Sequence, residues 1–354
     1  MKIVFGIGTA VAVLMATFFA YYGIRSFDNM SQLGAPTPQL EVRGYSYRDL
    51  NMTGALDPYE DSRLTPEDRA EDLLSRMTLE EKAGSMFITM IAVGVDGDLV
   101  ERPDPADQFS MMLPTNSEMV AAKRMNHFNV VFLHGAENMA IWQNKLQQMA
   151  ERTRLGIPVT IASDSRHAFG LNIAASLPAG DFSLWPEPLG MAATWDPALL
   201  RQFGDMARQE YLAVGIRLAL HPMADLATEP RWARAAGTFG EDAELSAQLV
   251  HAYIKGFQGE ELGPDSVATM VKHFSGGGPQ KDGEDAHFPY GKEQVYPGDN
   301  FDYHLIPFVK GCLPSGSCTD NALLRHTCWS NERRRRLCLQ QGYYYRHAAR
   351  QVWL

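Results

Sequence analysis

The chain has 354 residues and a formal net charge of −10, and 45% of its residues are hydrophobic. That length fits one α/β barrel of about 250 residues with extensions, or two ordinary domains. The hydrophobic share is typical of a globular core and argues against disorder. The acidic balance repels phosphate backbones and so argues against a nucleic-acid partner.

The chain opens with an apolar segment. After Lys2, a run from Ile3 to Ile24 carries no charge until Arg25. About 20 apolar residues can span a bilayer as a helix, and no small-x-small cleavage site follows. We expect residues 1–25 to direct export, either as an uncleaved membrane anchor or as a cleaved signal peptide of a periplasmic or secreted protein. A buried N-terminal core helix is the third alternative.

Residues 26–60 are polar and contain Pro36, Pro38 and Pro58. This composition predicts a linker that contributes nothing to a core.

The composition changes again at Gly311. Only two acidic residues, Asp320 and Glu332, follow it, together with four consecutive arginines and all four cysteines, Cys312, Cys318, Cys328 and Cys338. Four cysteines could form disulfides in an exported protein, and an arginine run could be a basic patch. However, shifting the reading frame by one base permits Ile-Met-Pro-Tyr-Tyr-Gly-Ile at 320–326 and removes the cysteines. We therefore predict that residues 311–354 are an out-of-frame, poorly packed tail.

Between residues 61 and 310, strand and helix signals alternate. Strands are predicted at 129–133, 157–162, 215–220 and 267–271, and helices after the Thr78 capping box, at 136–155, after Asp196-Pro197 and at 241–257. This alternation predicts a parallel α/β fold, either a barrel or an open doubly wound sheet. No Gly-x-Gly-x-x-Gly follows a strand, which disfavours dinucleotide binding. We expect no cofactor and no metal.

Polar residues follow two of these strands directly. Asp164 comes after the strand at 157–162, and Lys272-His273 comes after the strand at 267–271. In a barrel, the carboxyl ends of the strands form the catalytic face, so these side chains are candidates for a site.

Five ordered phrases resemble the N-terminal domain of family 3 glycoside hydrolases over residues 61–310. They are the entry helices at 64–82, Ile157 to His167, Trp185-Pro186 with 190–196, Pro230 to Asp242, and Lys272-His273-Phe274 with a Gly-rich loop. The resemblance implies a (β/α)8 TIM-like barrel, incomplete in this chain.

The resemblance places the family's sugar-binding residues at Asp164, Arg234, Lys272 and His273. A carboxylate accepts hydrogen bonds from adjacent ring hydroxyls, while Lys and Arg donate to hydroxyl oxygens. Each residue also has an ordinary structural interpretation. Asp164 could be a helix N-cap, Arg234 a surface ion pair, and His273 a core histidine.

Several neighbouring residues are expected to be structural. His167 is expected to pack the loop after Asp164. Trp185, Trp195 and Trp232 are expected to lie in the core, and Glu241-Asp242 is expected to start a helix. We leave His221 and Asp225 unassigned.

The resemblance also implies a retaining mechanism, with two carboxyl groups about 5 to 5.5 Å apart. Its nucleophilic Asp is expected beyond the chain end and its acid/base in a following domain, so the catalytic residues are unknown here. Gly277 stands where the glucosaminidase branch has a second His, which favours a β-glucosidase or xylosidase of carbohydrate metabolism. We expect a β-linked gluco-oligosaccharide or β-glucoside as substrate. The alternative is a catalytically inactive fragment or sugar-binding pseudoenzyme.

Overall fold

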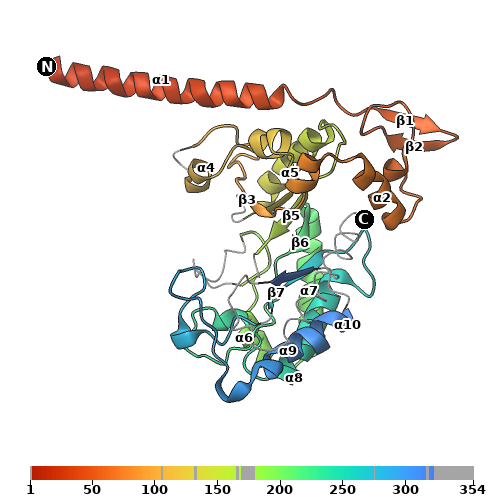
Figure 1. The fold of residues 1–354 in the computed structure, drawn as a ribbon, viewed down its shortest axis with the longest axis vertical. Coiled ribbons are helices and arrows are strands. Elements are labelled where there is room, and N and C mark those ends of the chain that lie inside the picture. The colour runs from red at the N-terminus through yellow and green to blue at the C-terminus, as the bar shows by residue number, and fades with distance from the viewer. Residues whose placement is uncertain are drawn as a thin grey trace. The chain divides into compact units, whose positions relative to one another are not determined.

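The computed structural model describes residues 2–104, 107–130, 134–164, 167–168, 180–274, 276–315 and 319–322 (Figure 1). The chain divides into two compact units, residues 1–160 and 161–354. Cys318, Cys328, Cys338 and the arginine run lie outside the described residues, so the shifted reading frame stays a prediction. The expectation of poor packing from Gly311 onward is wrong for the first tail residues, because Cys312 and Ser315 are buried.

The first unit opens with a long helix and a small hairpin. Helix α1 covers Lys2–Met30, and strands β1 (Gln39–Val42) and β2 (Tyr45–Arg48) pair antiparallel. Among the described residues, no helix is both long and apolar enough to cross a membrane.

The expectation that residues 26–60 contribute nothing to a core is wrong. Tyr47 and Tyr59 are buried, and the Tyr59 hydroxyl donates a hydrogen bond of 3.2 Å to the Leu155 carbonyl. Buried Glu60 accepts a hydrogen bond of 2.7 Å from the Leu50 N–H. The prolines and the polar composition suggested a linker without a core. However, aromatic rings spaced along a polar segment can be buried while the residues between them stay in water.

The rest of the first unit alternates helices and parallel strands. Its elements are η1 (Pro58–Glu60), α2 (Pro66–Arg76), α3 (Leu79–Gly84), β3 (Thr89–Ile91), α4 (Gln108–Met112), η2 (Glu118–Ala122), β4 (His127–Val130) and α5 (Ala136–Glu151). Strand β3 pairs parallel with β4. The predicted capping box is confirmed, since Thr78 Oγ1 accepts from the Glu81 N–H and Glu81 accepts from the Thr78 N–H.

The second unit contains the remaining parallel strands. They are β5 (Thr160–Ser163, which begins at the boundary between the units), β6 (Ile216–Ala219), β7 (Ala268–Phe274) and β8 (Thr319–Ala322). They lie in that order, and each is parallel to its neighbour. The helices are α6 (Pro188–Ala192), α7 (Pro197–Ala213), η3 (Ala235–Gly237), α8 (Ala243–Gln258), η4 (Lys281–Gly283), η5 (Pro297–Asp299), α9 (Phe301–Ile306), η6 (Pro307–Cys312) and α10 (Leu313–Ser315).

Helices α7 and α8 pack side by side (Figure 1). Gly204 and Gly256 face each other at their crossing, where a Cβ added to either would come within 3 Å of the other's Cα. Asp196 caps α7 and Asp242 caps α8, as predicted. The expectation of buried tryptophans holds for Trp232 but is wrong for Trp195, which is 70% exposed because it lies in the turn just before α7.

The α/β prediction is therefore confirmed. The strands from β3 to β8 alternate with helices, and the six strands among the described residues fall short of the eight that close such a barrel. Because the strands of the second unit are parallel, their carboxyl ends meet at one edge. Asp164 and the pair Lys272-His273 lie at that edge.

Candidate functional site

Lys272 and Asp164 form an ion pair at the carboxyl edge of the sheet. Asp164 directly follows β5, Lys272 lies in β7, and the Lys272 ammonium donates a hydrogen bond to Asp164 Oδ1. The Lys272 side chain is 4% exposed, whereas that of Asp164 is 26% exposed. The carboxylate thus neutralises a buried cation and still reaches solvent, where a ligand hydroxyl could contact it. The helix-cap alternative for Asp164 concerns residues 165–166, which lie outside the described residues.

Arg234 and His273 form the second half of the cluster. The Arg234 guanidinium donates from Nη1 to His273 Nε2 over 3.1 Å, and both side chains are buried. Burial excludes the interpretation of Arg234 as a surface ion pair. Lys272 and His273 are consecutive residues of β7, so the Asp164–Lys272 pair and the Arg234–His273 pair are linked through neighbouring positions of one strand.

Asp225 is the residue that the sequence did not assign. It is fully buried, and its carboxylate accepts hydrogen bonds from the His273 imidazole Nδ1 at 2.8 Å, from the His273 backbone N–H at 3.2 Å, and from the Gly277 N–H. A signal was present in the sequence, since Asp225 follows β6 by a few residues and so belongs to the same edge.

These contacts define the protonation of His273. Nδ1 faces a carboxylate and must carry the proton, while Nε2 faces a guanidinium N–H and must accept. Burial lowers the pKa of His273, and the charges of Arg234 and Lys272 lower it further, against the opposing effect of Asp225. The imidazole is therefore neutral at pH 7.

Asp225 stays ionised in the same surroundings. Burial raises the pKa of its carboxyl group, but the hydrogen bonds from His273 and Gly277 and the charge of Arg234 outweigh burial and hold that pKa below its ordinary value. Two carboxylates then balance Lys272 and Arg234, so the cluster carries no net charge. A balanced, buried set of donors and acceptors suits a neutral, hydroxyl-rich ligand.

The backbone around the cluster is held as tightly as its side chains. The Lys272 N–H donates to the Pro222 carbonyl over 3.1 Å, and the Ala224 N–H donates to the Lys272 carbonyl over 2.6 Å. A side chain at Gly278 would overlap the Leu226 carbonyl oxygen. The glycine-rich loop is therefore required for the Gly277 N–H to reach Asp225.

His167 is structural, as predicted. It is fully buried and stacks on Phe182 with ring centroids 4.9 Å apart. Its Nε2 lies 2.9 Å from Glu210, yet burial outweighs this carboxylate and lowers the pKa of His167 to about 4. His221 is likewise buried, between the hydroxyl groups of Tyr211 at 3.1 Å and Tyr253 at 2.7 Å.

The described cluster offers polar groups for hydroxyl contacts but has no catalytic pair. Asp225 has no exposed surface, and Asp164 neutralises Lys272. Retaining hydrolysis needs one carboxylate that reaches the anomeric carbon and a second that exchanges a proton with the leaving group. The described part of the chain also holds no group of three or more His, Cys, Asp or Glu side chains arranged for a metal ion.

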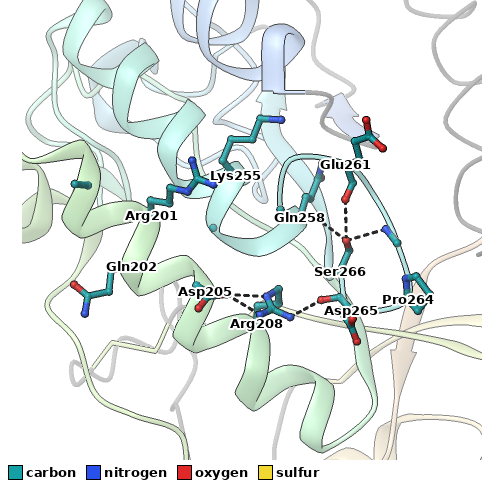
Figure 2. A pocket seen from close by; sticks show the side chains of 14 residues that line it. Arg201, Gln202, Asp205, Arg208, Lys255, Gln258, Glu261, Pro264, Asp265 and Ser266 are labelled. Atoms are coloured by element: carbon teal, nitrogen blue, oxygen red, sulfur yellow. Dashed lines mark hydrogen bonds and ion pairs between the residues drawn. The ribbon is translucent and has the colours of Figure 1, made fainter.

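A cavity of about 640 Å³ lies elsewhere in the second unit, between α7, α8 and the loop that precedes β7 (Figure 2). Its three basic side chains are already bound, Arg201 to Glu260 at 2.6 Å, Arg208 to Asp205 at 2.7 Å, and Lys255 to the Glu260 carbonyl at 2.9 Å. The loop enters β7 at its amino end, whereas the cluster lies at its carboxyl end. Loops at the amino end of barrel strands serve stability rather than catalysis.

Comparisons with known proteins agree with this architecture. Residues 78–317 match the glycosyl hydrolase family 3 N terminal domain, and the chain belongs to that family. It is 51% identical over 271 residues to beta-glucosidase C of Emericella nidulans. The aligned region covers 76% of this chain and 42% of that protein. It is 44% identical over 300 residues to the periplasmic beta-glucosidase/beta-xylosidase of Dickeya chrysanthemi. This aligned region covers 82% of this chain and 44% of that protein.

Among solved structures, a β-glucosidase from Erythrobacter marinus superposes with a TM-score of 0.59 at 26% identity, over 75% of this chain and 33% of that one. The chain thus spans less than half the length of each of these three relatives.

Proposed function

We propose that this domain binds the terminal, non-reducing glucose of β-linked glucosides, and that Asp164, Arg234, Lys272 and His273 contact its hydroxyl groups. The observation that carries the proposal is the charge-balanced cluster in which Asp164 neutralises a buried lysine and remains partly exposed. Ring hydroxyls can donate to that carboxylate and accept from the neighbouring ammonium and guanidinium groups. The names of the β-glucosidase relatives support this substrate class.

We propose hydrolysis with retention of configuration for the intact enzyme. A carboxylate would attack the anomeric carbon, and a second would protonate the leaving oxygen and then activate water. Neither carboxylate of the described cluster fits these roles, so other residues must supply them. The competing proposal is that this chain binds sugar without cleaving it.

We propose export for the protein, through residues 1–25. The apolar run after Lys2 supports it, and so does the Dickeya chrysanthemi relative, which is named periplasmic. A retained membrane anchor and a cleaved signal peptide are both compatible with this proposal. N-terminal sequencing of the exported protein decides between them.

Calorimetric titration of glucose into residues 26–354 tests the sugar site. Wild type should bind, and Asp164→Asn should bind at least ten-fold more weakly, because the exposed anionic acceptor is lost. Asp205→Asn is the matched control, since Asp205 also pairs with a basic residue, Arg208, but on helix α7. Equal affinity in all three proteins would overturn the assignment of Asp164.

A further inference from the structure

The segment between β7 and α9 contains a closed loop, residues 281–293. Its two ends are joined by a bridge between Gln280 and Gln294. The Lys281 N–H also donates to the Glu293 carbonyl over 3.1 Å, and the two side chains form an ion pair of 2.7 Å. The two ends of the loop therefore lie next to each other and are held together, as in a compact surface loop.

Two aromatic rings stand at the tip of this loop. Phe288 and Tyr290 are 51% and 62% exposed, and their rings are parallel to within 4° with centroids 5.2 Å apart. Pro289 stiffens the backbone between them. Gly291 closes the turn, because its N–H donates to the Phe288 carbonyl over 3.0 Å and a side chain there would overlap the Asp285 carbonyl oxygen.

The residues just before the two aromatic rings are polar. Asp285 accepts hydrogen bonds from the backbone N–H of His287 at 2.8 Å and from its imidazole at 2.6 Å. The loop thus presents a flat apolar surface beside hydrogen-bonding groups. A pyranose ring matches such a surface, because its C–H face can lie on an aromatic ring while its hydroxyl groups reach polar neighbours.

The loop is connected to the sugar site from two directions. It follows the Lys272-His273 pair and Gly277, which Asp225 fixes in place. It also runs against Arg231, three residues from Arg234, since Asp282 lies 3.4 Å from the Arg231 guanidinium and a Cβ at Gly283 would lie 2.8 Å from the Arg231 carbonyl carbon.

An electrostatic effect agrees with this placement. Burial raises the pKa of Asp285, but the two hydrogen bonds from His287, its charge and that of Arg234 hold this pKa below its ordinary value.

We propose that Phe288 and Tyr290 form a stacking platform for the second sugar ring of a β-linked gluco-oligosaccharide, next to the ring held by Asp164, Lys272 and Arg234. This inference rests on the proposed function, because it takes the four-residue cluster as the site of the first ring. A second ring explains why rigid aromatic surface is exposed at this position instead of being packed into the core.

Saturation-transfer NMR with methyl β-cellobioside and methyl β-laminaribioside tests the platform, because it detects weak binding and reports each sugar ring separately. With irradiation of the aromatic protons of the full chain, both rings of at least one disaccharide should receive saturation. The double variant Phe288→Ala/Tyr290→Ala should lose at least half of the transfer to the methyl-bearing ring. Tyr290→Phe should retain it, because the ring face is unchanged.

Trp195→Ala is the matched control, since Trp195 is an aromatic residue outside the loop that is even more exposed, at 70%, and it should leave the transfer unchanged. Asp164→Ala should abolish transfer to the non-reducing ring, which reports on the sugar site alone. Transfer to the non-reducing ring without transfer to the other ring in wild type would overturn the platform and leave the proposed function intact. Absence of transfer to both rings would overturn both. Dissociation of a wild-type dimer by the double alanine variant, measured by sedimentation, would assign the rings to a contact between copies and also overturn the platform.

Discussion

Asp225 lies 2.8 Å from Nδ1 of His273 and is completely buried beneath it. It therefore acts on a ligand only through His273 and the Gly277 N–H, as a positioning residue. Its carboxylate fixes the proton on Nδ1, and that leaves Nε2 to accept from Arg234.

The first prediction follows from this relationship. Asp225→Asn should shift the His273 proton toward Nε2, because an amide can donate to Nδ1 and a carboxylate cannot. Nε2–H would then face the Arg234 N–H, and Arg234 would lose its acceptor. Long-range ¹⁵N–¹H NMR of the imidazole should show the change of tautomer, and glucose affinity should fall at least five-fold. An unchanged His273 spectrum in a folded Asp225→Asn protein would refute this role.

Stability should fall with the same substitution. It leaves the buried charge of Arg234 without its balancing carboxylate, which typically costs about 3 kcal/mol. Urea unfolding of Asp225→Asn and of the control Asp205→Asn measures the difference. The control should change the free energy of unfolding by less than about 1 kcal/mol, since Asp205 lies on an exposed helix surface.

The Lys272–Asp164 pair makes a second stability prediction. Asp164→Asn should destabilise the domain by about 3 kcal/mol, because the buried ammonium of Lys272 loses its counter-charge. Asp164→Asn/Lys272→Met should recover most of that loss, since an apolar chain of similar length needs no partner. Both proteins should bind glucose at least ten-fold more weakly than wild type. If the double variant were no more stable than the single one, the buried charge would not be the cause.

Much of this site was predictable from the sequence, for identifiable reasons. Asp164, Lys272 and His273 directly follow strong strand signals, and Asp196 and Asp242 have the spacing of helix caps. Such features are local, so short stretches of sequence predict them.

Asp225 was not predictable in the same way. Its partners His273 and Gly277 lie about 50 residues further along the chain, and only the pairing of β6 with β7 brings them together. The prediction that Trp195 lies in the core was wrong for a related reason. Its size suggested core, but exposure depends on which face of a turn points outward, and no local pattern specifies that.

Acid should weaken the second unit through its buried histidines. Burial lowers the pKa of His167 to about 4 despite Glu210, and it lowers that of His304 to about 4 despite Asp225. In the unfolded chain each takes up a proton near pH 6.5. Between pH 6.5 and 4 the unfolded state therefore binds more protons, and each group removes about 1.4 kcal/mol of stability per pH unit.

Urea midpoints at pH 7.0 and 5.0 measure this loss. His304→Gln should reduce the difference between the two midpoints, whereas the exposed control His287→Gln should not. A midpoint that rose on acidification would contradict the direction of both shifts.

The final prediction concerns hydrolysis. Purified residues 26–354 should release no measurable product from an aryl β-glucoside, even where they bind glucose. The reason is chemical: Asp225 is enclosed and holds His273, and Asp164 neutralises Lys272, so neither carboxylate of the described cluster can serve as a nucleophile. Hydroxyl contacts can orient a sugar, but retention requires a covalent partner for the anomeric carbon and a second group to protonate the leaving oxygen. A gene whose frame is restored at codon 311 and extended to its natural stop should hydrolyse the same substrate. Sequencing across that codon and assaying both proteins side by side makes the comparison. Equal rates in the two proteins would place the nucleophile within residues 26–354 and remove the argument for a shifted tail.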